Sequence, residues 1–137
     1  MIYAVIDTNV LVSALLTGNP LSPTKKVLNM ITSGKIIPLI NDEVIAEYNE
    51  VLHRSKFPFK PQDVDNLITF ICKVGTDTSR TNYPESMPDE SDRVFFEITL
   101  SVEDSFLVTG NLKHYPKKPQ VITPAEFIDR FGTKDEL

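Results

Sequence analysis

Residues 2–9 have the sequence IYAVIDTN, and this stretch indicates the class of fold. Its first five residues are apolar without alternation, which is typical of a strand buried on both faces of a parallel sheet. The polar group Asp7-Thr8-Asn9 ends the strand, and an apolar segment follows through Leu16. Ligands of parallel sheets bind beyond the carboxyl ends of the strands, so Asp7 is the first candidate for a functional side chain.

Helices and strands are expected to alternate along the rest of the chain. Ser22, Asn41 and Thr123 are expected N-caps, two of them followed by proline at the first helical position. We expect helices over about residues 23–33, 42–54, 62–74, 90–102 and 124–131, and strands over residues 36–40, 76–79, 105–108 and 120–122. This order predicts an α/β domain with a central, mainly parallel sheet, and residues 1–137 are expected to form one domain.

The composition excludes several classes of protein. With 137 residues, 41% hydrophobic and 24% charged, the chain is not disordered and has no apolar run long enough for a membrane helix. Cys72 is the single cysteine, which favours a reducing compartment such as the cytoplasm. The start lacks the pattern of a signal peptide, so we interpret the sequence KDEL at residues 134–137 as a coincidence rather than a retention signal.

The net charge limits how nucleic acid could bind. The chain has 14 basic and 19 acidic residues, a net charge of −5, and a nucleic-acid-binding surface is usually basic. Either nucleic acid is not the partner, or it binds locally with the help of metal cations.

Three further acidic residues are candidates for a functional site. In the helix from Asp42, Glu47 lies nearest the apolar stripe at about 100° per residue, whereas Glu43 and Glu50 point further into solvent. Asp89 and Asp92 are three residues apart at the start of another helix. The alternatives are that Glu47 pairs with a surface cation and that Asp89 and Asp92 only cap their helix.

A fourth polar group follows the strand at residues 105–108. This group is Thr109-Gly110-Asn111, and in a parallel sheet it lies at the same edge as Asp7. The alternative is that Asn111 merely caps a turn.

Asp7, Glu47, Asp92 and Asn111 together offer only oxygen ligands, without His or Cys. Such sites favour Mg²⁺ or Mn²⁺, and that chemistry suits hydrolysis of phosphodiester bonds.

These four elements resemble, in the same order, those of PIN-domain ribonucleases. The matching stretches are IDTNVLV at residues 6–12, EVIAEYNEVL at 43–52, PDESD at 88–92 and LVTGN at 107–111. The nearest likeness is to the toxins of bacterial toxin–antitoxin pairs, the VapC-like group. The resemblance implies a PIN-like α/β/α sandwich that hydrolyses RNA as a metal-dependent endoribonuclease and serves as the toxin of a type II pair.

The resemblance also implies roles for individual residues and partners. Asp7, Glu47, Asp92 and Asn111 are expected to form the catalytic site, the first three as ligands of Mg²⁺ or Mn²⁺. A second set is expected to orient ligands or contact the substrate: Thr8, Asn9, Asp89, Thr109 and Lys113. The implied partners are an RNA substrate, a cognate antitoxin protein and a second copy in a homodimer, with no membrane.

Asn111 departs from the family pattern, which has Asp at this position. Asparagine keeps an oxygen ligand but removes one negative charge, which disfavours a second metal ion. Asp89 and Asp104 are candidates to compensate for the lost charge.

The segment at residues 113–118, KHYPKK, is basic. It is either a solvated loop or a substrate contact in which lysines attract phosphates, Tyr115 stacks on an unpaired base and His114 acts as a general acid.

Three alternatives to a ribonuclease stay open to different degrees. A PIN-like module that binds RNA or protein with little catalysis is favoured by Asn111 and opposed by the intact Asp7, Glu47 and Asp92. An aspartyl phosphatase requires Asp at position 9, where this chain has Asn9. A dinucleotide-binding enzyme is disfavoured because no GxGxxG motif follows a strand.

Overall fold

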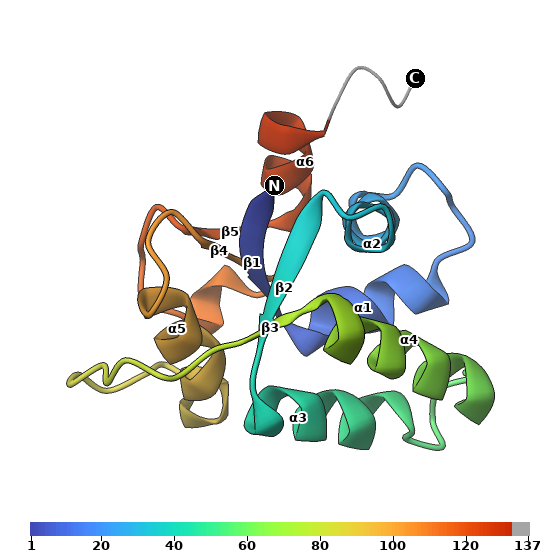
Figure 1. Ribbon diagram of the computed structural model, residues 1–137, viewed down its shortest axis with the longest axis horizontal. Coiled ribbons are helices and arrows are strands. Elements are labelled where there is room, and N and C mark those ends of the chain that lie inside the picture. Colours follow the sequence, from blue (N-terminus) through green and yellow to red (C-terminus); the bar gives the residue numbers. More distant parts are fainter. Residues whose placement is uncertain (133–137) are drawn as a thin grey trace.

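The computed structural model describes residues 1–132, so the KDEL sequence lies outside the described residues. Within them the elements follow in the order shown in Figure 1: β1 Ile2–Ile6, α1 Thr8–Leu16, α2 Pro23–Thr32, β2 Ile36–Ile40, α3 Asp42–Leu52, α4 Pro61–Val74, β3 Thr76–Asp77, the 3₁₀ turn η1 Glu90–Asp92, α5 Arg93–Leu100, β4 Phe106–Val108, the 3₁₀ turn η2 Leu112–His114, β5 Val121–Ile122 and α6 Pro124–Phe131.

The five strands of the described chain form one sheet in the order β3-β2-β1-β4-β5, and every pairing is parallel. The predicted α/β fold is confirmed, and the sheet is parallel throughout rather than mainly so. β1 is central, which explains why Ala4, Val5 and Ile6 are all at most 1% exposed. Figure 1 shows α5 on one side of the sheet and α2 and α4 on the other.

The predicted N-caps are confirmed. The Ser22 side chain accepts from Lys25 N–H, and the Asn41 side chain accepts from Val44 N–H. Thr123 forms a reciprocal capping box with Glu126. These caps satisfy backbone donors that a helix start otherwise leaves unpaired, and they fix where α2, α3 and α6 begin.

Several elements differ from the prediction. The apolar segment through Leu16 is the helix α1, which begins directly after Asp7 because the Asp7 side chain caps it. The helix expected from residue 90 begins as the turn η1, and α5 ends at Leu100. The strand expected near residues 76–79 is only two residues long, and the turn η2 was not predicted.

Two features place α3 near the carboxyl edge of the sheet. Asn41, its N-cap, follows directly on β2, and the hydroxyl of the buried Tyr48 donates to the carbonyl of Ile6 at the end of β1. One face of α3 therefore lies against the strand end that carries Asp7. No helix in residues 1–132 has the length and apolar character needed to cross a membrane.

Candidate metal centre

The Asp7 carboxylate is held by two hydroxyl groups from the segment that follows β4. Its backbone N–H donates to the carbonyl of Val108 at 3.0 Å, which ties the end of β1 to the end of β4. Its Oδ2 accepts from the Thr109 hydroxyl at 2.8 Å and from the Tyr115 hydroxyl at 2.9 Å. The residue is 4% exposed, so the carboxylate has a fixed orientation at the carboxyl edge of the sheet.

Glu47 reaches the same edge from α3. Its carboxylate accepts a hydrogen bond from the hydroxyl of Thr8, the residue next to Asp7. Burial raises the pKa of Glu47, the Thr8 hydrogen bond opposes this rise, and the nearby charge of Asp7 adds to it. Glu43 and Glu50 are exposed, as expected, and pair with Arg80 and Arg54 respectively.

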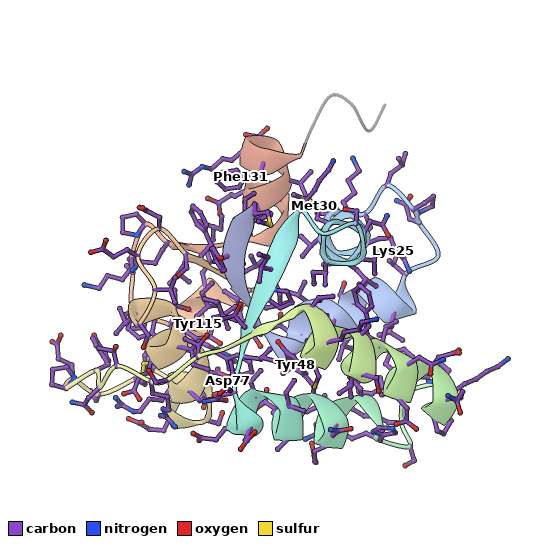
Figure 2. The ribbon with its side chains drawn as sticks, viewed as in Figure 1. Lys25, Met30, Tyr48, Asp77, Tyr115 and Phe131 are labelled. Carbon is purple, nitrogen blue, oxygen red and sulfur yellow. The ribbon has the colours of Figure 1, made fainter. Side chains whose placement is uncertain are left out.

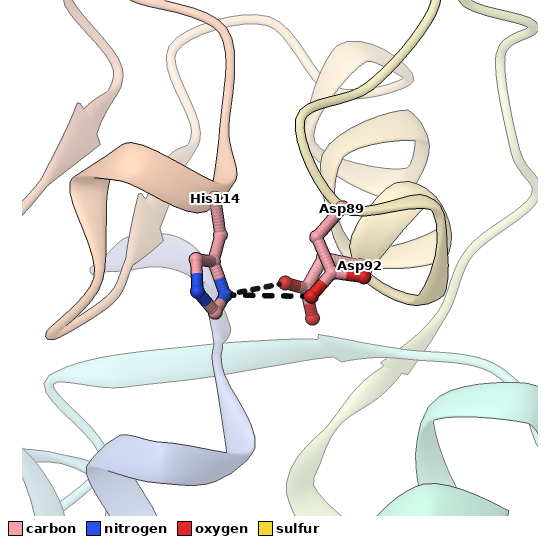
Figure 3. Close-up of side chains that lie close together, drawn as sticks. All are labelled: Asp89, Asp92 and His114. Atoms are coloured by element: carbon pink, nitrogen blue, oxygen red, sulfur yellow. Dashed lines mark hydrogen bonds and ion pairs between the residues drawn. The ribbon is translucent and has the colours of Figure 1, made fainter.

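The carboxylates of Asp89 and Asp92 lie close to the imidazole of His114. His114 Nδ1 lies 3.0 Å from Asp92 Oδ2 and 3.7 Å from Asp89 Oδ2, as Figure 3 shows. One ligand atom from each of the three residues lies within 4.8 Å of the others, a spacing that allows them to share one metal ion. The sequence predicted a set of oxygen ligands alone, and the structure adds a nitrogen donor beside them, because the turn η2 places the imidazole of His114 next to η1.

The pKa of Asp92 is raised to about 6. Burial is the main cause, followed by the negative charges of Asp7 and Asp89, while His114 acts in the opposite direction. Asp89 is more exposed and its pKa is lowered, chiefly because the Ser91 hydroxyl and backbone N–H donate to its carboxylate. The charge of Asp7 thus opposes ionisation of both Glu47 and Asp92, a situation that a bound cation relieves.

The remaining predicted residues differ in how directly they are linked to Asp7. Thr109 is fully buried, and its hydroxyl also accepts from the backbone N–H of Asn111 at 3.0 Å. The Asn9 side-chain oxygen accepts from Gly110 N–H at 3.1 Å, which joins the two strand ends again. Asn111 and Lys113 are exposed. Within residues 1–132 the Asn111 side chain forms no hydrogen bond with the carboxylates, so only its backbone is linked to Asp7.

The structure disfavours two of the alternatives that the sequence left open. Stacking of Tyr115 on an unpaired base was one of them, but the residue is 3% exposed and its hydroxyl donates to Asp7. Figure 2 shows its position near the ends of the strands. Asp104 was a candidate to replace the charge missing at Asn111, but it lies in the turn before β4, at the opposite edge of the sheet.

A buried ion pair that sequence analysis did not identify holds the segment before η1. Glu97 on α5 is 4% exposed and accepts from the Arg80 guanidinium at 2.9 Å and from Tyr83 N–H at 2.8 Å. Arg93 donates in turn to the carbonyls of Tyr83 and Glu85. These contacts fasten residues 80–85 to α5 and so limit the positions available to Asp89 and Asp92 further along the chain.

The repulsion within the cluster predicts that Asp92→Asn stabilises the metal-free protein at pH 7. The raised pKa means that the folded state binds a proton more tightly than the unfolded chain between about pH 4 and 6, so Asp92 contributes less stability as the pH rises through that range. We expect the variant to gain about 1–2 kcal/mol at pH 7 and almost nothing at pH 4. Urea unfolding in EDTA at both pH values measures this gain. A variant less stable than the parent at pH 7 would show that Asp92 has a structural role instead.

The donor set fits a divalent cation of the kind expected. Among the described residues, the group whose ligand atoms lie within 4.8 Å of one another is Asp89, Asp92 and His114, without Asp7 and Glu47. Its two carboxylates offer hard oxygen ligands, which suit Mg²⁺ and Mn²⁺. The imidazole of His114 adds a donor that Mn²⁺ accepts more readily than Mg²⁺. The residues present therefore fit the metal that the sequence indicates.

Comparison with known proteins agrees with this arrangement. The sequence matches the family described as PIN domain over residues 3–113, a range that includes Asp7, Glu47, Asp92 and Asn111 and ends one residue before His114. No curated protein matches the chain, and no solved structure matches it. The matched range covers most of the 137 residues and includes all four stretches that carry the candidate site residues, so the chain belongs to the PIN domain family.

Proposed function

We propose that this protein is an Mg²⁺- or Mn²⁺-dependent endoribonuclease and the toxin of a type II toxin–antitoxin pair. The observation that carries the proposal is the placement of Asp7 near both Glu47 and Asp92 at the carboxyl edge of the sheet, where burial above all, and also the charge of Asp7, raise the pKa of both carboxyls. Members of the PIN domain family are generally nucleases, which supports hydrolysis of a phosphodiester as the reaction.

Each side chain has a distinct task in this proposal. Asp7, Glu47 and Asp92 bind the cation, which when bound activates water and neutralises charge that develops on the phosphate. Thr109 and Tyr115 fix the orientation of the Asp7 carboxylate by donating to one of its oxygens. His114 does the same for Asp92 and lies where it can also ligate the metal.

Incubation of the purified protein with a labelled single-stranded RNA tests the proposal. With Mn²⁺ we expect internal cleavage, and with excess EDTA we expect none. RNA binding without cleavage in either condition would contradict the proposal and favour the alternative of a binding module. That alternative is supported by the exposed, uncharged amide of Asn111.

The toxin role and its partners are tested in cells. We propose that the protein acts in the cytoplasm as a homodimer and is inhibited by a cognate antitoxin protein. Induced expression is expected to stop growth, whereas co-expression of the antitoxin or the substitution Asp7→Asn restores it. Growth arrest that persists in the Asp7→Asn variant would contradict the toxin role of the nuclease site.

The substitution Asn111→Asp is expected to tighten binding of Mn²⁺ by about tenfold, because affinity at oxygen sites depends on the number of charged ligands. Without metal the variant is expected to be less stable, since it adds a negative charge near Asp7. Titration calorimetry measures the affinity, and Asn66→Asp on the exposed face of α4 serves as the matched control. Equal affinity of both variants would mean that position 111 does not face the metal.

A further inference from the structure

A large cavity borders the candidate metal centre on the side of η2. It has a volume of about 640 Å³, within the range of about 300–1,000 Å³ that is usual for ligand pockets. We call it the lysine pocket and define it by its lining residues: Leu112, Lys113, Tyr115, Pro116, Lys117, Lys118, Pro119 and Val121. All but Leu112 and Lys113 lie outside the range matched by the PIN domain family.

The charge of the lysine pocket is opposite to that of the rest of the chain. Residues 112–119 contain three lysines and neither Asp nor Glu, in a protein whose net charge is −5. Lys113, Lys117 and Lys118 are all exposed. A local group of lysines on an acidic protein attracts a polyanion to one place rather than over a broad surface.

The remainder of the lysine pocket is apolar. Leu112 is 41% exposed, although it is a large hydrophobic residue, and Val121 and the two prolines extend the same surface. Apolar surface beside lysines can bind single-stranded nucleic acid, because a base buries part of its face against the apolar side chains and the phosphates pair with the cations.

The lysine pocket is joined to the metal centre through shared side chains. Tyr115 lines the pocket and donates through its hydroxyl to Asp7. The residue between Lys113 and Tyr115 is His114, which contacts Asp92. An occupant of the pocket therefore lies next to the atoms that would hold the cation, as a neighbouring nucleotide of a bound RNA strand must.

We propose that the lysine pocket binds one nucleotide of single-stranded RNA adjacent to the scissile phosphate, an inference that rests on the proposed function. The base packs on the apolar surface near Leu112, and Lys117 and Lys118 contact phosphates of the same strand. Each of these contacts is independent of the metal, so the pocket binds RNA in EDTA as well.

Fluorescence anisotropy with a short labelled single-stranded RNA in EDTA, at several salt concentrations, tests the lysine pocket. Lys117→Glu/Lys118→Glu is expected to weaken binding at least about tenfold and to reduce the slope of log affinity against log salt by about 1.4, which corresponds to two phosphate contacts. Leu112→Ser is expected to weaken binding about threefold to tenfold without changing the slope. The matched control is Lys56→Glu/Lys73→Glu, which has the same net charge as the pocket variant. Lys56 lies on the connection between α3 and α4, Lys73 lies on α4, and both are exposed. The control is expected to bind RNA more tightly than the pocket variant and to show the same salt dependence as the parent.

The outcomes separate the lysine pocket from the proposed function. If the parent protein binds RNA without cleaving it and the pocket variants lose this binding, the proposed role of the lysine pocket is supported and the proposed nuclease activity is contradicted. If the protein cleaves RNA and the pocket variants bind and cleave like the charge-matched control, the pocket proposal is overturned. It is also overturned if a labelled acidic peptide, and not RNA, depends on Leu112, Lys117 and Lys118 for binding.

Discussion

Asp7→Asn is expected to reduce Mn²⁺-dependent cleavage of RNA by at least about 100-fold while the protein stays folded. Asp7 is the residue on which the site converges, because its charge acts on both Glu47 and Asp92 and its carboxylate is held by Thr109 and Tyr115. Asparagine has nearly the same shape, and its side-chain oxygen can still accept from both hydroxyls. The loss would therefore come from the missing charge on a metal ligand rather than from a disturbed fold.

Cleavage rates of the parent and the Asp7→Asn variant measure this effect, with circular dichroism and unfolding in urea to confirm the fold. Glu50→Gln provides a control on the same helix, because Glu50 is an exposed carboxylate that pairs with Arg54 and has only a minor effect on the pKa of Glu47, smaller than that of Asp7. The control is expected to cleave at the parent rate. A fully active Asp7→Asn variant, prepared free of contaminating nuclease, would rule out Asp7 as a metal ligand.

Glu97→Ala is expected to lower the free energy of unfolding by about 2–4 kcal/mol. The carboxylate is almost fully buried and accepts from Arg80 and from the backbone N–H of Tyr83. Its removal leaves the Tyr83 amide and the Nε of Arg80 without their acceptor, although the Nη1 of Arg80 keeps its bonds to Glu43. Although burial acts to raise the pKa of Glu97, these hydrogen bonds outweigh it and lower the pKa. The stabilising effect is therefore present near neutral pH and is lost in acid.

A second effect of Glu97→Ala reaches the metal centre. Residues 80–85 lose the part of their attachment to α5 that the Glu97 carboxylate provides, while the bonds from Arg93 to the carbonyls of Tyr83 and Glu85 remain. Asp89 and Asp92 are then held less firmly, and Mn²⁺ is expected to bind about tenfold more weakly. Glu50→Ala is again the matched control, and loss of this exposed ion pair is expected to change stability by less than about 1 kcal/mol. Equal destabilisation by the two substitutions would show that the Glu97 ion pair does not hold the segment.

The sequence predicted the sheet and the position of Asp7 because both depend on local patterns. Continuous apolar runs at residues 2–6 and 36–40 are sufficient to identify buried parallel strands, and the polar residues after β1 and β4 then share an edge. The orientation of Glu47 followed from helical periodicity alone. These inferences need only the residues of one element at a time.

The position of His114 and the role of Glu97 could not be predicted in the same way. His114 reaches Asp92 only because η2 turns the chain back after β4, and three residues without apolar periodicity give no signal for such a turn. Glu97 lies on the strongly apolar helix α5, and its partner Arg80 is 17 residues away in a segment without regular structure. Both contacts depend on how distant segments pack, which local sequence patterns do not encode.

The central claim is that Asp7, Glu47 and Asp92 form a centre for one divalent cation, and the anomalous scattering of Mn²⁺ in crystals of the parent protein tests it most directly. We predict a peak at the carboxyl edge of the sheet, with carboxylate oxygens of Asp7, Glu47 and Asp92 at about 2.1–2.3 Å. The same crystals of the Asp7→Asn variant are expected to lack the peak. Saturating Mn²⁺ that leaves this edge empty in the parent, or that binds only elsewhere, would contradict the account.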